Sequence, residues 1–202
     1  MKRAVLMLTM AGLCTASAVD IGAGWSVVYP DRAVGADAGT EYALRSLAKD
    51  LALDLEEAIG SKVPAVAQSK ADKGTRGLWL GAPAAKAAGY SFGDWRFLEN
   101  AYAATNGSVY CFGNDRQAVR DMSAWESHRV LLPSARAAMR FMRDVVGVRY
   151  VMPGRPGTVV PRAAKPSLAD GAMRFEISGN FVGRIKGAKC PFDLQFLTWD
   201  FS

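Results

Sequence analysis

A serine between two glycines is the clearest chemical motif in this sequence. The stretch over residues 89–93, GYSFG, matches the G-x-S-x-G pattern of a nucleophile elbow, in which the serine lies on a sharp turn between a strand and a helix. The sequence before it, AAKAA, and the sequence after it, DWRF, show neither clean strand nor clean helix periodicity. We therefore expect a glycine-flanked loop at Ser91 and not an elbow.

A serine hydrolase would also need a base and an acid beside Ser91. His128 is the only histidine in the chain, and the acids that could orient it are Asp94, Asp115 and Asp121. Serine hydrolysis through these residues stays open as one alternative. Labelling with a fluorophosphonate probe would test it.

Paired carboxylates would indicate glycoside hydrolysis, which requires two of them about 5 to 9.5 Å apart. Asp54, Glu56 and Glu57 fall on the solvent side of a predicted helix, and Asp193 and Asp200 fall in the final segment. No pattern places them in a cleft. We interpret them as solvated surface acids, so the sequence offers no catalytic residue.

Arginines at helical spacing could bind a sugar acid, because a guanidinium matches a carboxylate in shape and charge. Arg136, Arg140 and Arg143 have this spacing. A solvated helix face has the same spacing, and we expect that simpler arrangement here.

Three tryptophans could stack on sugar rings: Trp79, Trp95 and Trp125. Aromatic residues are more often core or interface anchors, and Trp79 is expected in the core because it falls in an apolar strand. The residues that would bind a sugar are therefore unknown from the sequence.

Metal and cofactor chemistry is not indicated. The spacings C-x-x-C and H-E-x-x-H are missing from the sequence, so we expect neither a metal nor a cofactor. Cys111 and Cys190 remain after the leader described next. In an exported protein they could form a disulfide or stay as two separate thiols, and both alternatives remain open.

Residues 1–18 predict a signal peptide. They contain two cations, an apolar run over residues 4–13 and the small-residue site A-S-A at 16–18. The run is shorter than the roughly 20 apolar residues of a membrane helix. We expect cleavage after Ala18, a secreted or periplasmic protein and no transmembrane segment. A lipoprotein would need a small residue before Cys14, where Leu13 stands.

Hydrophobic periodicity predicts an α+β fold, with a mixed β-sheet and two main helices packed on one face. The expected helices span residues 40–59 and 134–146 and end at Gly60 and Gly147. The expected strands span 25–29, 63–67, 76–80, 148–153, 158–161 and 173–179, with a hairpin over 97–112 that turns at Asn106-Gly107. Residues 84–88 are expected to form one helical turn, and residues 115–132 a loop with a helical turn at 117–122.

Residues 19–175 form the predicted domain, and residues 176–202 the start of a linker or following domain. The ending LQFLTWDF is apolar and aromatic, whereas natural termini are usually polar. We therefore expect a chain that is truncated before a further domain.

The formal net charge of the chain, +6, comes from scattered cations, so no nucleic-acid surface is indicated.

Five stretches carry a resemblance to a known family. They are Ile59-Gly60 with Val63-Pro64, Leu78 to Gly81, Tyr110 to Gly113, Phe141 to Gly154, and Val159 to Pro161. Together they resemble the N-terminal domain of family 67 glycoside hydrolases, the α-glucuronidases, which is similar to the α+β domain before the barrel of β-hexosaminidases. The resemblance covers about residues 25–175, and its last part is the most specific.

The resemblance implies a function without catalysis in this chain. The catalytic carboxylates of family 67 enzymes lie in the barrel after this domain, and the sequence does not contain that barrel. Residues 115–133 also form a longer connection than is usual in the family. The implied role is an accessory domain of a secreted carbohydrate-active protein, with a C-terminal catalytic barrel and a poly- or oligosaccharide as partners. The alternative is a stand-alone exported carbohydrate-binding domain.

Overall fold

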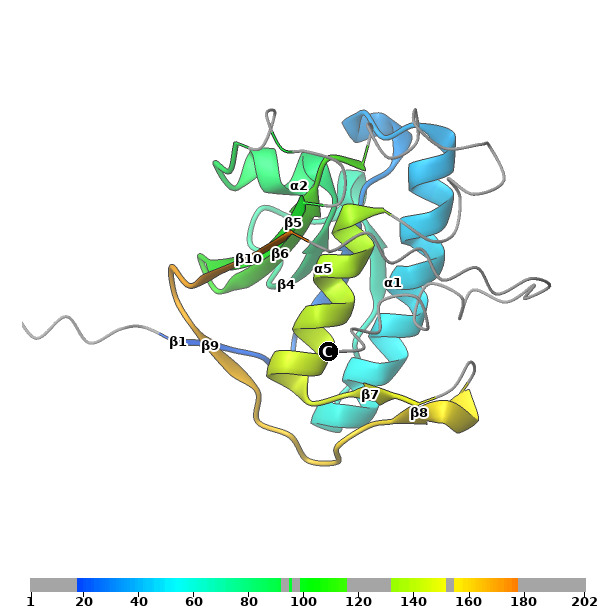
Figure 1. Cartoon of the computed structure of the whole chain (residues 1–202), viewed down its shortest axis with the longest axis vertical. Helices are drawn as coiled ribbons and strands as arrows, with labels where there is room; N and C mark the ends of the chain where they lie inside the picture. The colour runs from blue at the N-terminus through cyan, green and yellow to red at the C-terminus, as the bar shows by residue number, and fades with distance from the viewer. Residues whose placement is uncertain (1–17, 92–94, 96–98, 116–131, 152–154, 178–202) are drawn as a thin grey trace, which may run out of the picture.

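The structure, a computed structural model, describes residues 18–91, 95, 99–115, 132–151 and 155–177 (Figure 1). A six-stranded mixed sheet forms its centre, in the order β10-β5-β6-β4-β2-β3. These strands are β2 (Ser26–Tyr29), β3 (Ala65–Ala67), β4 (Gly77–Leu80), β5 (Glu99–Thr105), β6 (Ser108–Gly113) and β10 (Met173–Ile177). Strands β3, β2, β4 and β6 run parallel, and β5 is antiparallel to both of its neighbours. The predicted α+β class with a mixed sheet is confirmed.

Two helices cover one face of the sheet, as predicted (Figure 1). They are α1 (Ala38–Ile59) and α5 (Pro133–Phe141), and α5 continues as the π-helical η3 (Met142–Val146). Leu44, Leu47, Leu51 and Leu55 of α1 are buried against the sheet. Burial of one such leucine contributes about 2 kcal/mol, which explains why the i, i+3, i+4 spacing was a reliable guide to this helix.

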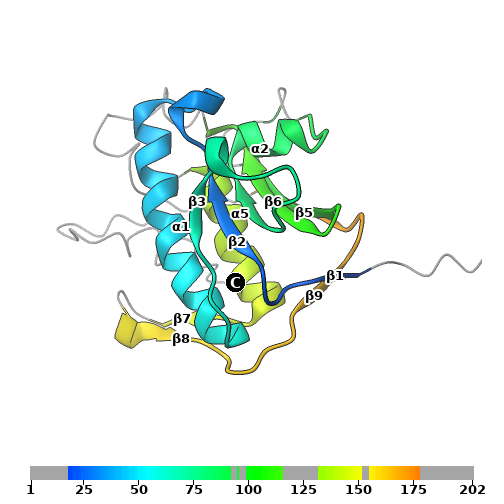
Figure 2. The same cartoon turned by 180° about the vertical axis from the view of Figure 1, so that it is seen from behind.

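The opposite face of the sheet has a smaller cover. The short helix α2 (Ala82–Ala87) lies over one end of it, as Figure 2 shows from behind. Ala85 of α2 packs on Ala101, Ala103 and Phe112 in a second apolar cluster. Successive strand residues alternate between the two faces, so Val27 joins the α1 side while Val28 points to the other.

The hairpin turn and the helix ends that were predicted from local sequence are present in the structure. Asn106 and Gly107 join β5 to β6 with φ of 52° and 73°, which is the pair of left-handed residues that a type I′ hairpin turn requires. The glycines predicted to end the two main helices, Gly60 and Gly147, also have positive φ.

Several expected strands are shorter in the structure. Strand β3 begins at Ala65. Of the predicted strand over 148–153, residues 152–153 lie outside the described ranges, and the rest contains β7 (Arg149–Tyr150), which pairs with β8 (Thr158–Val159). Strand β1 (Ala18–Asp20), which was not predicted, pairs with β9 (Ser167–Ala169). Three short 3-10 helices complete the described elements: η1 (Arg32–Val34), η2 (Gln68–Lys70) and η4 (Arg155–Gly157).

Two predicted segments fall outside the described residues: the signal peptide, apart from Ala18, and the turn expected at 117–122. None of the described helices combines the length and hydropathy that crossing a bilayer needs.

Candidate functional site

The chain changes direction at the carboxyl ends of two neighbouring parallel strands. Strand β2 is followed by α1, which covers one face of the sheet and leads to β3 at the sheet edge. Strand β4 is followed by α2, which lies on the opposite face. When adjacent strands send their helices to opposite faces, a crevice opens between the loops, and ligands of open α/β sheets bind in this position.

A cavity of about 600 Å³ lies at this point. Its walls come from the loop after β2, from α2 and the loop that follows it, and from the two residues after β6. The lining residues are Val34, Gly35, Ala36, Asp37, Thr40, Ala82, Pro83, Lys86, Gly89, Tyr90, Ser91, Asn114 and Asp115. This volume lies within the range of small-molecule sites, which is about 300–1,000 Å³.

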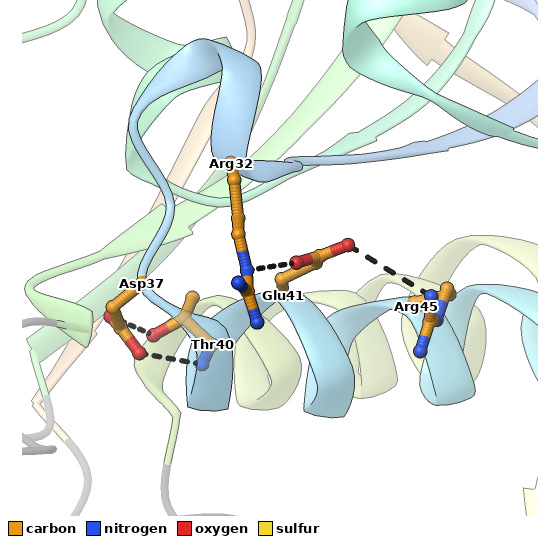
Figure 3. Close-up of polar contacts among 5 residues, drawn as sticks. All are labelled: Arg32, Asp37, Thr40, Glu41 and Arg45. Carbon is orange, nitrogen blue, oxygen red and sulfur yellow. Dashed lines mark hydrogen bonds and ion pairs between the residues drawn. The ribbon is translucent and has the colours of Figure 1, made fainter.

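Asp37 is held at one side of the cavity by its role as the N-cap of α1 (Figure 3). Its carboxylate oxygens accept hydrogen bonds from the Thr40 amide at 2.9 Å and the Thr40 hydroxyl at 2.7 Å. Burial opposes ionisation, but hydrogen bonds, chiefly from Thr40 and also from the Gly39 backbone, together outweigh it, so the pKa of Asp37 is lowered. Asp37 therefore presents a fixed negative charge.

Asp115 connects the end of β6 to the start of α5. Its carboxylate accepts hydrogen bonds from the Ser134 amide at 3.0 Å and the Ser134 hydroxyl at 2.6 Å. Burial raises the pKa of Asp115 to about 6, because desolvation outweighs the two hydrogen bonds from Ser134. The N-cap residue of α5, Leu132, makes no side-chain hydrogen bond to the helix. Asp115 therefore caps the first turn of α5 in its place.

Lys86, Tyr90 and Ser91 form the opposite wall of the cavity. The Tyr90 ring is stacked on Phe112, with centroids 5.0 Å apart and an interplanar angle of 23°. Lys86 and Ser91 are exposed. This wall thus combines one fixed ring with two polar groups that solvent reaches.

A second, shallower hollow of about 460 Å³ lies beside the N-terminus of α1. Glu41 binds Arg32 at 3.1 Å and Arg45 at 3.9 Å there (Figure 3). Glu41 thus pairs with both arginines of this hollow, and its other acid, Asp31, accepts from Ser69, so the hollow offers fewer free groups than the cavity beside Asp37.

The serine motif lies in a loop, as expected from its context. Helix α2 and a left-handed Gly89 precede Ser91, whereas a nucleophile elbow needs a strand in that place. The structure does bring Ser91 and Asp115 to the same cavity. The other triad candidates, His128, Asp94 and Asp121, lie outside the described residues.

The prediction that Asp54 is a solvated acid is wrong. Its side chain is 1% exposed and accepts hydrogen bonds from the Tyr150 hydroxyl at 3.0 Å and from Arg155. Arg155 also binds Glu57 at 2.7 Å. Glu56 and Glu57 are exposed, as predicted, and Glu56 also accepts a hydrogen bond from the Val63 amide at 3.2 Å. The β7–β8 segment covers this side of α1, which helix periodicity alone could not indicate. The remaining candidate acids, Asp193 and Asp200, lie outside the described residues.

The prediction of a solvated arginine face is also wrong for Arg140, which is only 9% exposed. Its guanidinium donates to the Asn100 side-chain oxygen at 3.1 Å and lies 5.7 Å from the centre of the Tyr102 ring. Arg136 and Arg143 are partly buried. Strands β5 and β6 pack against α5. None of these three arginines therefore lies on a fully solvent-exposed face of the helix.

The aromatic candidates stack on other protein rings. Trp79 is partly exposed on the α2 side of the sheet and stacks with Tyr110 at 6.0 Å, while Trp95 stacks with Phe112 at 5.4 Å. Trp79 is therefore at the margin of the packed sheet face and not in the main core. Trp125 lies outside the described residues.

Cys111 is a free, buried thiol in β6, and Cys190 lies outside the described residues. Burial raises the pKa of the Cys111 thiol well above its ordinary value. Among the described residues, no group of three or more histidine, cysteine or acidic side chains could hold a metal ion.

Sequence reasoning missed most of the cavity, including Lys86, Tyr90 and Asn114. One signal was present: polar residues directly after predicted strands, such as Asn114 and Asp115 after β6, mark the carboxyl edge of a parallel sheet. The cavity also depends on which face of the sheet each helix covers, and the sequence does not determine this.

Comparison with known proteins assigns no relative, because neither a family model nor a curated protein matches this chain. The fold and the cavity define it as an α+β sheet domain with an open crevice at the carboxyl ends of its parallel strands.

Proposed function

We propose that this chain is a non-catalytic accessory domain of a secreted carbohydrate-active protein related to the α-glucuronidases. The main support is the state of its buried acids. Among the described residues, Asp31, Asp54 and Asp115 are buried, and each accepts hydrogen bonds from another element of the fold. A glycosidase needs two carboxylates that face a substrate and exchange protons with it, whereas these three acids are engaged in hydrogen bonds within the fold.

The Leu78 to Gly81 stretch of the family resemblance supports the proposal because it coincides with a junction of the fold. Gly81, at the end of the Leu78 to Gly81 stretch, joins β4 to α2 with φ of 90°. A Cβ at this position would lie 2.9 Å from Pro30 and 3.2 Å from Leu44. This stretch therefore requires glycine for a structural reason, as expected of a motif that preserves a fold.

An activity assay tests the non-catalytic role. The mature chain, residues 19–202, should release no product from glucuronoxylan or from aryl glycosides. Turnover by the purified chain that is lost in Asp115→Asn or Ser91→Ala would contradict the proposal. N-terminal sequencing of the exported protein tests secretion, and the expected first residue is Val19.

The alternative is a stand-alone exported carbohydrate-binding domain, which the open cavity beside Tyr90 favours. Reading the gene beyond the codon for Ser202 separates the two. An open frame that encodes a barrel supports the accessory role, whereas a stop codon supports the stand-alone domain.

A further inference from the structure

The α2 side of the cavity presents hydrogen-bonding groups that the protein itself does not use. In the described part of the chain, the Lys86 ammonium and the hydroxyls of Tyr90 and Ser91 form no hydrogen bond. Together they offer one charged donor and two groups that can both donate and accept. A bound molecule could use all three without breaking an internal contact.

The opposite side of the cavity supplies acceptors. The two oxygens of the Asp37 carboxylate accept from the Thr40 amide and hydroxyl, and a carboxylate has about four acceptor positions in all. Asn114 and Asp115, at the end of β6, also line the cavity, but Asp115 is 2% exposed and its carboxylate already accepts from Ser134. Donors and acceptors therefore face the cavity from different elements, an arrangement that suits a ligand with several hydroxyl groups.

Apolar groups also line the cavity. The Tyr90 ring is fixed by its stacking on Phe112, and Val34 and Pro83 contribute further apolar lining. A sugar ring has apolar C–H faces and a rim of hydroxyl groups. It would therefore match one aromatic ring flanked by polar side chains.

The charges favour a neutral ligand over an anionic one. Two carboxyl groups, Asp37 and Asp115, line the cavity against a single cation, Lys86. A sugar acid would gain one ion pair with Lys86 but would meet the fixed negative charge of Asp37. A neutral sugar can accept from Lys86 and donate to Asp37 at no such cost.

We propose that this cavity is a binding site for one or two residues of a neutral sugar. The inference rests on the proposed carbohydrate-linked function and names the ligand class of this site. The volume of about 600 Å³ suits a ligand of that size.

Titration of the mature chain with xylotriose, cellotriose and digalacturonate tests the proposal, with calorimetry for affinity and backbone amide NMR shifts for location. We expect a neutral trisaccharide to bind and to shift amides of residues 34–37, 82–91 and 114–115. Lys86→Met and Ser91→Ala should each weaken binding about five- to tenfold, the usual loss for one hydrogen bond. The matched control Lys62→Met, an exposed lysine in the turn between α1 and β3, should bind as the wild type does.

Three results would each overturn the proposal: no binding of either neutral sugar at millimolar concentration, tighter binding of digalacturonate, or affinity that neither cavity variant changes. These results are separate from failure of the proposed function. A chain that hydrolyses glycosides would refute the accessory role whatever the cavity binds, whereas an inactive chain with an empty cavity would refute only this inference.

Discussion

The Tyr150 hydroxyl donates a hydrogen bond of 3.0 Å to the Asp54 carboxylate across 96 positions of the chain. This contact joins the C-terminal part of α1 to the β7–β8 pair, and Arg155 reinforces it from the 3-10 helix before β8. Burial is the largest influence on Asp54 and raises its pKa, against the lowering effect of Tyr150 and Arg155. The carboxylate therefore depends on its donors to remain buried.

Removing the Tyr150 hydroxyl should destabilise the fold. Tyr150→Phe leaves the ring in place but deprives a buried carboxylate of a donor, which costs about 1–3 kcal/mol of unfolding free energy. Urea denaturation measures the loss. The control is Tyr42→Phe, because Tyr42 is 56% exposed on α1. Equal stabilities for the two variants would show that the Tyr150 hydrogen bond contributes nothing.

Asp115 should make stability depend on pH between about 4 and 6. Its pKa in the folded chain, about 6, is above the ordinary value of 3.8, so the folded state holds this proton more tightly. The resulting stabilisation is fully present below pH 3.8, falls as the pH rises and is lost above about 6. At about 1.4 kcal/mol per pH unit, the total is about 3 kcal/mol.

Asp115→Asn isolates this effect because an amide keeps an oxygen for the Ser134 amide and does not titrate. We expect the variant to become more stable relative to the wild type as the pH rises from 4 to 6, and the difference to stay level above pH 6.5. Thermal unfolding of both proteins across pH 3.5–7.5 measures it. A difference that does not change with pH would refute the raised pKa.

A methyl group at Gly77 should disrupt the sheet. A Cβ on this residue of β4 would collide with the Ser26 carbonyl of the neighbouring strand β2, and backbone cannot move aside as a flexible side chain can. We expect Gly77→Ala to lose about 3 kcal/mol or more, at the upper end for overpacking. Gly74→Ala is the control, since nothing lies within 4 Å of its added Cβ. Similar melting temperatures for both variants would contradict this packing.

Features that depend on neighbouring residues were predictable from the sequence, and features that depend on distant partners were not. The leucines of α1 and the Asn106-Gly107 turn are determined by spacing and local conformation, and both predictions are confirmed. The burial of Asp54 depends on Tyr150, and the burial of Arg140 on Asn100. No periodicity within one helix encodes such a partner.

The cavity is one of the features that depend on residues distant in the sequence. Its residues come from three strand ends that are distant in sequence, and its existence depends on α1 and α2 taking opposite faces of the sheet. The composition of α2, APAAKA, indicates a helix but does not indicate a side. Sequence reasoning consequently named Ser91 and Asp115 for a catalytic triad and overlooked the cavity that they share.

Arg140 should be a structural residue whose loss is measurable. Its guanidinium binds the fully buried Asn100 side-chain oxygen at 3.1 Å and lies over Tyr102. Arg140→Met keeps most of the apolar stem but removes the charged donor, so we expect a loss of about 1.5–3 kcal/mol, the range for hydrogen bonds to charged groups. Arg162→Met, at an exposed arginine, should change stability by less than about 0.5 kcal/mol. Chemical denaturation of the two variants gives the comparison. If both are as stable as the wild type, then Arg140 belongs to a solvated helix face after all, and the packing of α5 on β5 described above is incorrect.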